Sequence, residues 1–85
     1  VNLNMYSDMK IAHDRYEVYV NADLVGDKTI LTQNEDIFDI EHYLKAQGFE
    51  GFSTELDGDH FIIGTENPAE AAAMKKALEV YLNIR

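Results

Sequence analysis

Hydrophobic and polar residues alternate with a period of two in several short stretches of the chain. In the stretch 16–21, Tyr16, Val18 and Val20 occupy one side, and Glu17 and Tyr19 are among the residues on the other. This period, carried by β-branched and aromatic residues, predicts half-buried β-strands. We expect strands at 16–21, 28–32, 51–57 and 60–65.

Two other segments have the helical period. In 36–47, Ile37, Ile40 and Leu44 recur at helical spacing, and we expect Asn34 to cap this helix and Gly48 to end it. The segment 69–83 consists of strong helix formers behind an Asn67-Pro68 pair, which is typical of an N-cap and first helical position. The sequence therefore predicts helices at 36–47 and 69–83.

The predicted order of elements is ββαββα. The dipeptide Asp57-Gly58 favours a tight hairpin between the last two strands, and connection rules place strand 60–65 between strands 28–32 and 51–57. Strand 16–21 then pairs with 28–32 at one edge. We expect an α+β two-layer sandwich: a four-stranded antiparallel sheet with two helices on one face, in a circularly permuted ferredoxin-like layout.

The chain has the length of one domain. We expect residues 15–85 to form a single α+β domain and residues 1–14, which lack a firm period, to form an N-terminal arm. Hydrophobic residues make up 46% of the chain, which favours an ordered globule. The absence of cysteine, of a long apolar run and of a secretory leader pattern favours a cytoplasmic protein without membrane contact.

The net charge restricts the possible partners of the protein most strongly. Sixteen acidic residues against seven basic ones give a formal net charge of −9. This charge repels nucleic acid and anionic membranes and attracts basic proteins. If Tyr16 and Val18 point toward the helices, the opposite face of the sheet carries acidic rather than basic residues, so we expect no direct binding of nucleic acid.

Several motifs are better explained without special chemistry. Asp57-Gly58-Asp59 resembles the start of a calcium loop, but the twelfth position is Pro68 instead of glutamate. The histidines are widely spaced and lack metal-ligand spacing, and no nucleophile signature accompanies Ser7 or Ser53. We therefore expect a non-enzymatic protein with no cofactor and no metal.

The leading hypothesis is a small acidic protein-binding module, such as an inhibitor that imitates nucleic acid and occupies a basic, nucleic-acid-binding surface of a partner. The alternative is a homodimeric regulatory or small-ligand-sensing domain that associates through the open sheet face. The expected partner-binding residues combine charge, an aromatic anchor and one titratable imidazole. They are Glu17, Tyr19, Glu55, Asp57, Asp59 and His60.

Overall fold

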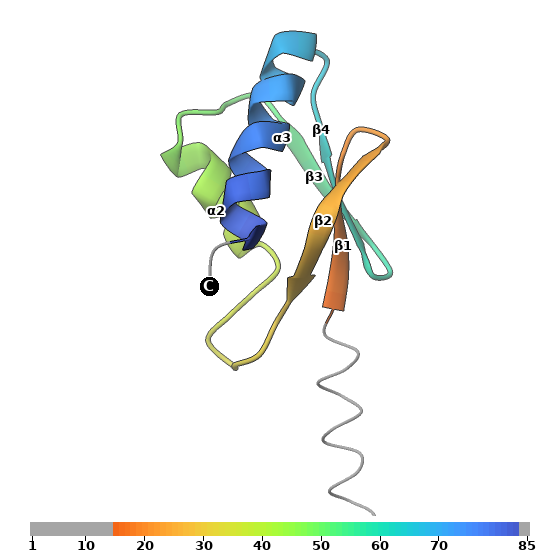
Figure 1. Ribbon diagram of the computed structural model, residues 1–85, viewed down its shortest axis with the longest axis vertical. Coiled ribbons are helices and arrows are strands. Elements are labelled where there is room, and N and C mark those ends of the chain that lie inside the picture. Colours follow the sequence, from red (N-terminus) through yellow and green to blue (C-terminus); the bar gives the residue numbers. More distant parts are fainter. Residues whose placement is uncertain (1–14, 84–85) are drawn as a thin grey trace, which may run out of the picture.

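The computed structural model describes residues 15–83, and the predicted arm at 1–14 lies outside this range. The elements along the chain are β1 (Arg15–Val20), β2 (Asp23–Thr29), α2 (Asp39–Ala46), β3 (Ser53–Asp57), β4 (His60–Gly64) and α3 (Pro68–Asn83). Figure 1 shows the two helices packed on one side of a four-stranded sheet. The predicted α+β sandwich and its ββαββα order are confirmed.

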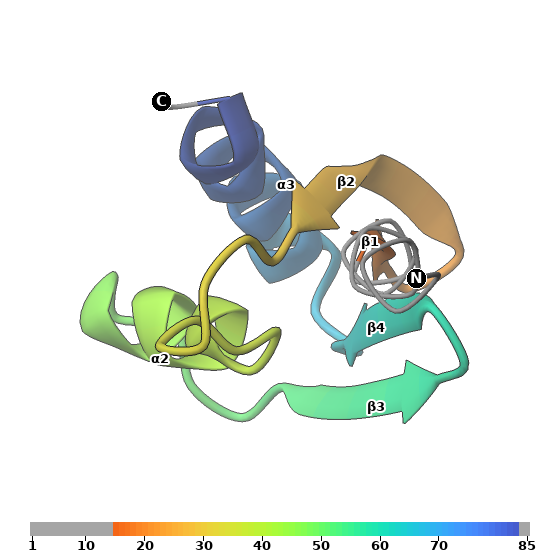
Figure 2. The same ribbon diagram turned by 90° about the horizontal axis from the view of Figure 1, so that it is seen from below.

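The sheet is mixed, which corrects the prediction of an antiparallel sheet. Its strand order is β2-β1-β4-β3, and β1 runs parallel to β4 while the other pairs are antiparallel. The predicted contact between strands 28–32 and 60–65 is therefore wrong, because β1 occupies the place beside β4. The permuted ferredoxin-like layout is not confirmed. Figure 2 shows the strands curving around the helices in this order.

The composition of β1 explains its central place. Val18 and Val20 of β1 are fully buried, as is typical of a strand that has neighbours on both sides and a helical layer on one face. The corresponding inward positions of β2 hold Lys28, Gly26 and Asp23, which are paired with Tyr16, Val18 and Val20. These residues suit an edge, where polar side chains reach solvent.

The first hairpin is tighter than expected. Strands β1 and β2 are joined by Asn21 and Ala22, and Asn21 adopts a positive φ of 55°, which asparagine tolerates. The register shifts between Val18 and Tyr19, and this bulge interrupts the alternation of β2. The predicted strand at 28–32 is therefore wrong: β2 spans 23–29, and the chain after Thr29 is a loop.

The second hairpin agrees with the sequence prediction. Asp57 pairs with His60, so the turn consists of Gly58 and Asp59, and Gly58 carries the positive φ of 61°. Glycine at the first position of a two-residue turn accepts this conformation without strain. The same residues that suggested a calcium loop thus form a hairpin turn.

Helix α2 begins later than predicted. Asn34 does not cap it; instead the Asp36 side chain accepts the amide of Phe38 at 2.8 Å, and Asp39 accepts the amide of Asp36 at 3.1 Å. This reciprocal pair orders a turn ahead of the helix. At the other end Gly48 adopts a φ of 99°, and the amide of Phe49 donates to the Leu44 carbonyl at 3.1 Å, which completes a Schellman motif.

Helix α3 starts where the sequence predicted. The Asn67 side chain accepts the amides of Ala69 and Glu70 at 3.0 and 3.2 Å. Pro68 follows as the first helical residue, where its missing amide hydrogen costs nothing. No helix within residues 15–83 is long and apolar enough to cross a membrane.

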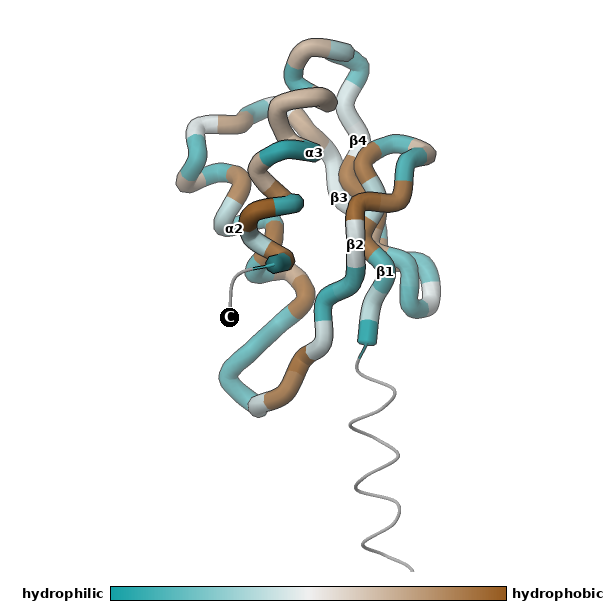
Figure 3. The backbone as a smooth tube through the Cα atoms, viewed as in Figure 1, coloured by the Kyte–Doolittle hydropathy of each residue, from teal (hydrophilic) through white to brown (hydrophobic). Residues whose placement is uncertain are grey.

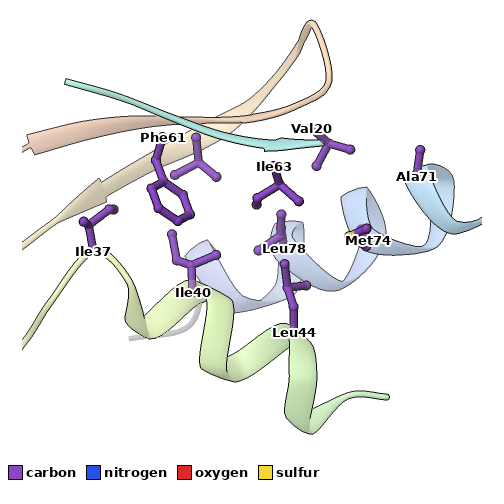
Figure 4. Packing of buried hydrophobic residues seen from close by; sticks show 10 residues of the cluster. Val20, Ile37, Ile40, Leu44, Phe61, Ile63, Ala71, Met74 and Leu78 are labelled. Carbon is purple, nitrogen blue, oxygen red and sulfur yellow. The ribbon is translucent and has the colours of Figure 1, made fainter. Parts of the chain in front are cut away.

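One core lies between the sheet and the helices. Figure 4 shows side chains from β1, β4 and both helices converging there. Phe61 of β4 is fully buried and makes an edge-to-face contact with Phe38, with ring centroids 5.3 Å apart. The buried residues are Val18, Val20, Ile37, Ile40, Leu44, Phe61, Ile63, Ala71, Met74 and Leu78.

Glycine at position 26 allows α3 to lie close against β2. A Cβ atom there would stand 3.2 Å from Cδ1 of Leu82, which is tighter than ordinary van der Waals contact.

Hydrophobic stretches of the strands and helices alternate with hydrophilic ones, and the tip of the β3–β4 hairpin is hydrophilic (Figure 3). The sheet face opposite the helices is covered by no other element within residues 15–83; we call it the open face.

Candidate partner-binding face of the sheet

The register of the strands builds an acidic row across the open face. Residues paired across neighbouring strands point to the same side of a sheet. Glu17 of β1 pairs with Asp27 of β2 and with His60 of β4, and His60 pairs with Asp57 of β3. The acidic row is therefore Asp27, Glu17, His60 and Asp57, one residue from each strand.

An apolar row lies beside it. Tyr19 pairs with Leu24 on one side and with Ile62 on the other, and Ile62 pairs with Glu55. Leu24 is 57% exposed, whereas Tyr19 and Ile62 are half-buried. The apolar row is thus Leu24, Tyr19 and Ile62, and it ends at the Glu55 carboxylate on the β3 edge.

His60 sits between two carboxylates at the centre of the face. Its Nε2 lies 3.0 Å from Oε1 of Glu17 and 3.6 Å from Oδ1 of Asp59, and its ring centroid lies 5.1 Å from that of Tyr19. The His60 side chain is 44% exposed, so solvent reaches it. When protonated, His60 places one positive charge among these carboxylates.

The Glu17 carboxylate also binds Tyr19. Its hydroxyl donates to Oε1 of Glu17 at 2.9 Å. This hydrogen bond raises the pKa of Tyr19 above its ordinary value, and partial burial and the Glu17 charge act in the same direction. Glu17 therefore orients the two aromatic side chains of the open face, Tyr19 and His60.

Arg15 balances one end of the acidic row. Its guanidinium forms an ion pair with Asp27, and the hydrogen bond and the charge of Asp27 raise the pKa of Arg15. Both side chains are well exposed to solvent, so we expect this pair to add little to stability. Its effect is to neutralise the β2 end of the acidic row.

The β3 end of the open face keeps its charge. Within residues 15–83, Glu55 and Asp57 form no ion pair, and Asp59 in the hairpin turn faces only His60. Each of these three residues is exposed. Negative charge is thus concentrated along β3 and its hairpin, away from Arg15.

Lysines lie on the helix side of the molecule. Lys75 of α3 pairs with Asp23, and Lys45 pairs with Glu41 one turn away on α2 at 3.0 Å. Lys28 points toward α3, with its Nζ 5.2 Å from the centre of the Tyr81 ring. The helix side and the loops also carry most of the carboxylates within residues 15–83, so the open face is distinguished by its lack of lysine and not by the sign of its charge.

The structure brings the six predicted site residues to one face or its rim. Glu17, Tyr19, Asp59 and His60 form one contact cluster, while Glu55 and Asp57 are related to it by strand register. Sequence reasoning missed Arg15, Asp27 and Leu24. The misplaced second strand hid the last two, since Asp27 and Leu24 face Glu17 and Tyr19 only when β2 spans 23–29.

Hollows on the surface lie away from the centre of the open face. The first, of about 610 Å³, is bounded by the end of β4 and the start of α3 around Asn67 and Glu70. The second, of about 770 Å³, lies between β2 and the end of α3 and includes Lys28 and Tyr81. Both are open to solvent. The first contains Glu66 and Glu70, which makes an anionic ligand unfavourable there, and the second contains two carboxylates and two cations.

Within residues 15–83, no three histidine, aspartate or glutamate side chains are arranged to hold a metal ion. Comparisons of the chain with protein-family models, curated proteins and solved structures gave no match. The open face is therefore the part of the described surface whose chemistry bears most directly on function.

Proposed function

We propose that the protein is a small binding module whose open face engages a basic surface of a partner protein. The observation that carries this proposal is the cluster of carboxylates that the strand register builds on the open face. Five carboxylates belong to the open face and its hairpin, and Arg15 is its one fixed cation within residues 15–83. They are Glu17, Asp27, Glu55, Asp57 and Asp59.

The apolar row supplies a second part of the surface. Tyrosine anchors are frequent in protein interfaces because they bury a large area at a low entropic cost. Tyr19 lies between Leu24 and Ile62 and is already fixed by Glu17. A partner that covers this row would remove apolar surface from water while its cations meet the carboxylates around it.

Carboxylates on a rigid sheet resemble the phosphates of a nucleic acid in charge. A partner whose basic groove normally holds nucleic acid would be blocked by this face, which makes inhibition one form of the proposed function. Electrostatic steering would make such an association fast and sensitive to salt.

The proposal is tested with two variants of equal net charge. The open-face variant carries Glu17→Gln, Glu55→Gln and Asp59→Asn. The control variant carries Glu50→Gln, Glu66→Gln and Glu79→Gln, at exposed positions outside the sheet. Each immobilised protein captures partners from a lysate of its source cell, and the captured protein is eluted with rising salt.

We expect the wild-type protein and the control variant to retain the same basic protein, and the open-face variant to lose it. Elution should require increasing ionic strength, since salt screens exposed charges. An equal loss of capture in both variants would show that net charge, rather than the open face, is responsible. Capture that is indifferent to salt would contradict the charge mechanism.

The alternative function is a homodimer joined through the open face. The exposed Leu24 beside Tyr19 and Ile62 favours it, because a second copy would cover this apolar row. The carboxylates oppose it, since both copies would bring the same charges together. Sedimentation equilibrium decides between the two: a monomer at high concentration and high salt excludes the dimer.

A further inference from the structure

The two outer strands of the sheet differ in how open their edges are. β2 contains a bulge at Val25, opposite the step from Val18 to Tyr19 of β1. This bulge disrupts the regular spacing of edge hydrogen-bond groups, and α3 lies close against β2 at Gly26. β3 pairs with β4 over its whole length without a shift in register. Figure 2 shows β3 at the rim of the sheet with no described element beyond it.

The hydrogen bonds of β4 identify the free groups of β3. The amides of Glu17 and Asn21 donate to the carbonyls of Asp59 and Ile63, at 2.8 and 2.7 Å. The backbone N–H and C=O groups of the odd-numbered residues of β4 therefore point to β1. Those of His60, Ile62 and Gly64 point to β3. Their partners are Asp57, Glu55 and Ser53.

Thr54 and Leu56 therefore point their backbone N–H and C=O groups outward. Such an edge is a template for pairing with another strand. Leu56 adds a second feature: its side chain lies on the helix side of the sheet, beside the buried Phe61, yet it remains 40% exposed. An added strand would cover Leu56 and satisfy both backbone groups at that position.

The side chains of β3 specify what the added strand must carry. Glu55 and Asp57 point to the open face and form no ion pair within residues 15–83. In an antiparallel pairing centred on Leu56, they occupy the non-hydrogen-bonded positions, where opposing side chains come closest. The facing residues would be cationic, and the residue between them, opposite Leu56, would be apolar.

We infer that β3 is the docking edge for an extended partner segment with a basic–apolar–basic pattern, which pairs antiparallel to residues 53–57. This inference rests on the proposed function and names its mode of recognition. A second copy of this chain is a poor occupant, because pairing β3 with itself would bring Glu55 and Asp57 of both copies together, and like charges directly opposite destabilise a sheet.

The experiment uses two hexapeptides of identical composition, RVRVRV and RRRVVV, each acetylated and amidated. They carry the same charge, but only the first presents cations and apolar residues on alternate sides of a strand. Binding to the full chain is measured by isothermal titration calorimetry. Amide hydrogen exchange of Thr54 and Leu56 is followed by NMR in the free and bound protein.

We expect the alternating peptide to bind about tenfold more tightly than the block peptide, from cross-strand pairs and edge hydrogen bonds together. Exchange of the Thr54 and Leu56 amides should slow only with the alternating peptide. Equal affinity of both peptides, or unchanged exchange, would overturn the inference while leaving electrostatic binding by the open face intact. Absence of binding by either peptide would contradict both the inference and the proposed function.

Two variants locate the contact. Leu56→Pro removes an outward amide hydrogen but none of the hydrogen bonds to β4, and edge strands tolerate such a substitution. It should lower the affinity for the alternating peptide to that for the block peptide. Should this variant fail to fold, Glu55→Lys serves instead, with Glu50→Lys as its control of equal charge. Equal loss in both lysine variants would overturn the β3 assignment.

Discussion

The imidazole of His60 on β4 lies with its Nε2 3.0 Å from Oε1 of Glu17 on β1. The same carboxylate oxygen accepts the hydroxyl of Tyr19 at 2.9 Å. One carboxylate thus fixes two aromatic side chains at the centre of the open face. This arrangement depends on the parallel pairing of β1 with β4, which places Glu17 directly beside His60.

The Tyr19–Glu17 hydrogen bond predicts a change in stability at alkaline pH. Because the pKa of Tyr19 is raised in the folded protein, this contribution is complete below the unfolded-state pKa and is lost as pH rises through the folded pKa. The free energy of unfolding of the wild-type protein should therefore fall relative to Tyr19→Phe in that window. Urea unfolding of both proteins across alkaline pH measures the difference, and parallel curves would contradict it.

The hydrogen bonds of Glu35 predict the opposite pH dependence of stability, in the acidic range. Its Oε1 accepts the amides of Leu31 and Thr32 at 2.7 and 3.2 Å, and these bonds lower the pKa of Glu35. The contribution is present above the unfolded-state pKa and is lost as pH falls through the folded pKa. Acid unfolding should begin at a lower pH in Glu50→Gln than in Glu35→Gln, since residue 50 makes no such contacts. Identical acid midpoints would be incompatible with this role.

The two candidate N-caps give a matched pair. Asn67→Ala removes the acceptor of two α3 amides and should destabilise the protein by about 1 kcal/mol. Asn34→Ala lies in the loop before α2, which Asp36 organises instead, and should change the unfolding free energy by less than about 0.5 kcal/mol. Urea unfolding of the two variants checks this. An Asn34→Ala cost equal to that of Asn67→Ala would contradict the assigned start of α2.

The core predicts a large difference between two apolar residues of the β3–β4 hairpin. Phe61 is fully buried and Leu56 is 40% exposed. Phe61→Ala should cost about 3–5 kcal/mol, enough to unfold a marginally stable domain. Leu56→Ala should cost much less, because the exposed part of its side chain gains little from folding. Circular dichroism during urea unfolding compares them, and similar costs would contradict the position of β3 at the sheet edge.

Local signals in the sequence were sufficient for the second half of the fold. Asp57-Gly58 and Asn67-Pro68 each combine turn or cap chemistry with an uninterrupted period, and the structure places β4 and α3 accordingly. The bulge at β2 breaks the alternation around Val25. The strand was therefore predicted too late in the chain, at 28–32, where Ile30 and Leu31 are apolar. Strand order was missed because the alternation of a strand fixes its buried side but not its neighbours.

Sequence reasoning placed the candidate residues on the sheet more accurately than it ordered the strands. Alternation alone put Glu17 and Tyr19 on one side of β1 and His60 on the same side of β4. Their contacts required the parallel register, which no local pattern specifies. The role of Arg15 and Asp27 could be recognised only after β2 was placed opposite β1.

The most direct test of the open face is an NMR titration of the isotope-labelled chain with a hexa-arginine peptide at low and high salt. We predict chemical-shift changes at Glu17, Tyr19, Glu55 and His60, with little change on α3, and their disappearance at high salt. Shifts spread over both sides of the molecule, or centred on the helices, would contradict the claim that the open face is the surface that binds a basic partner.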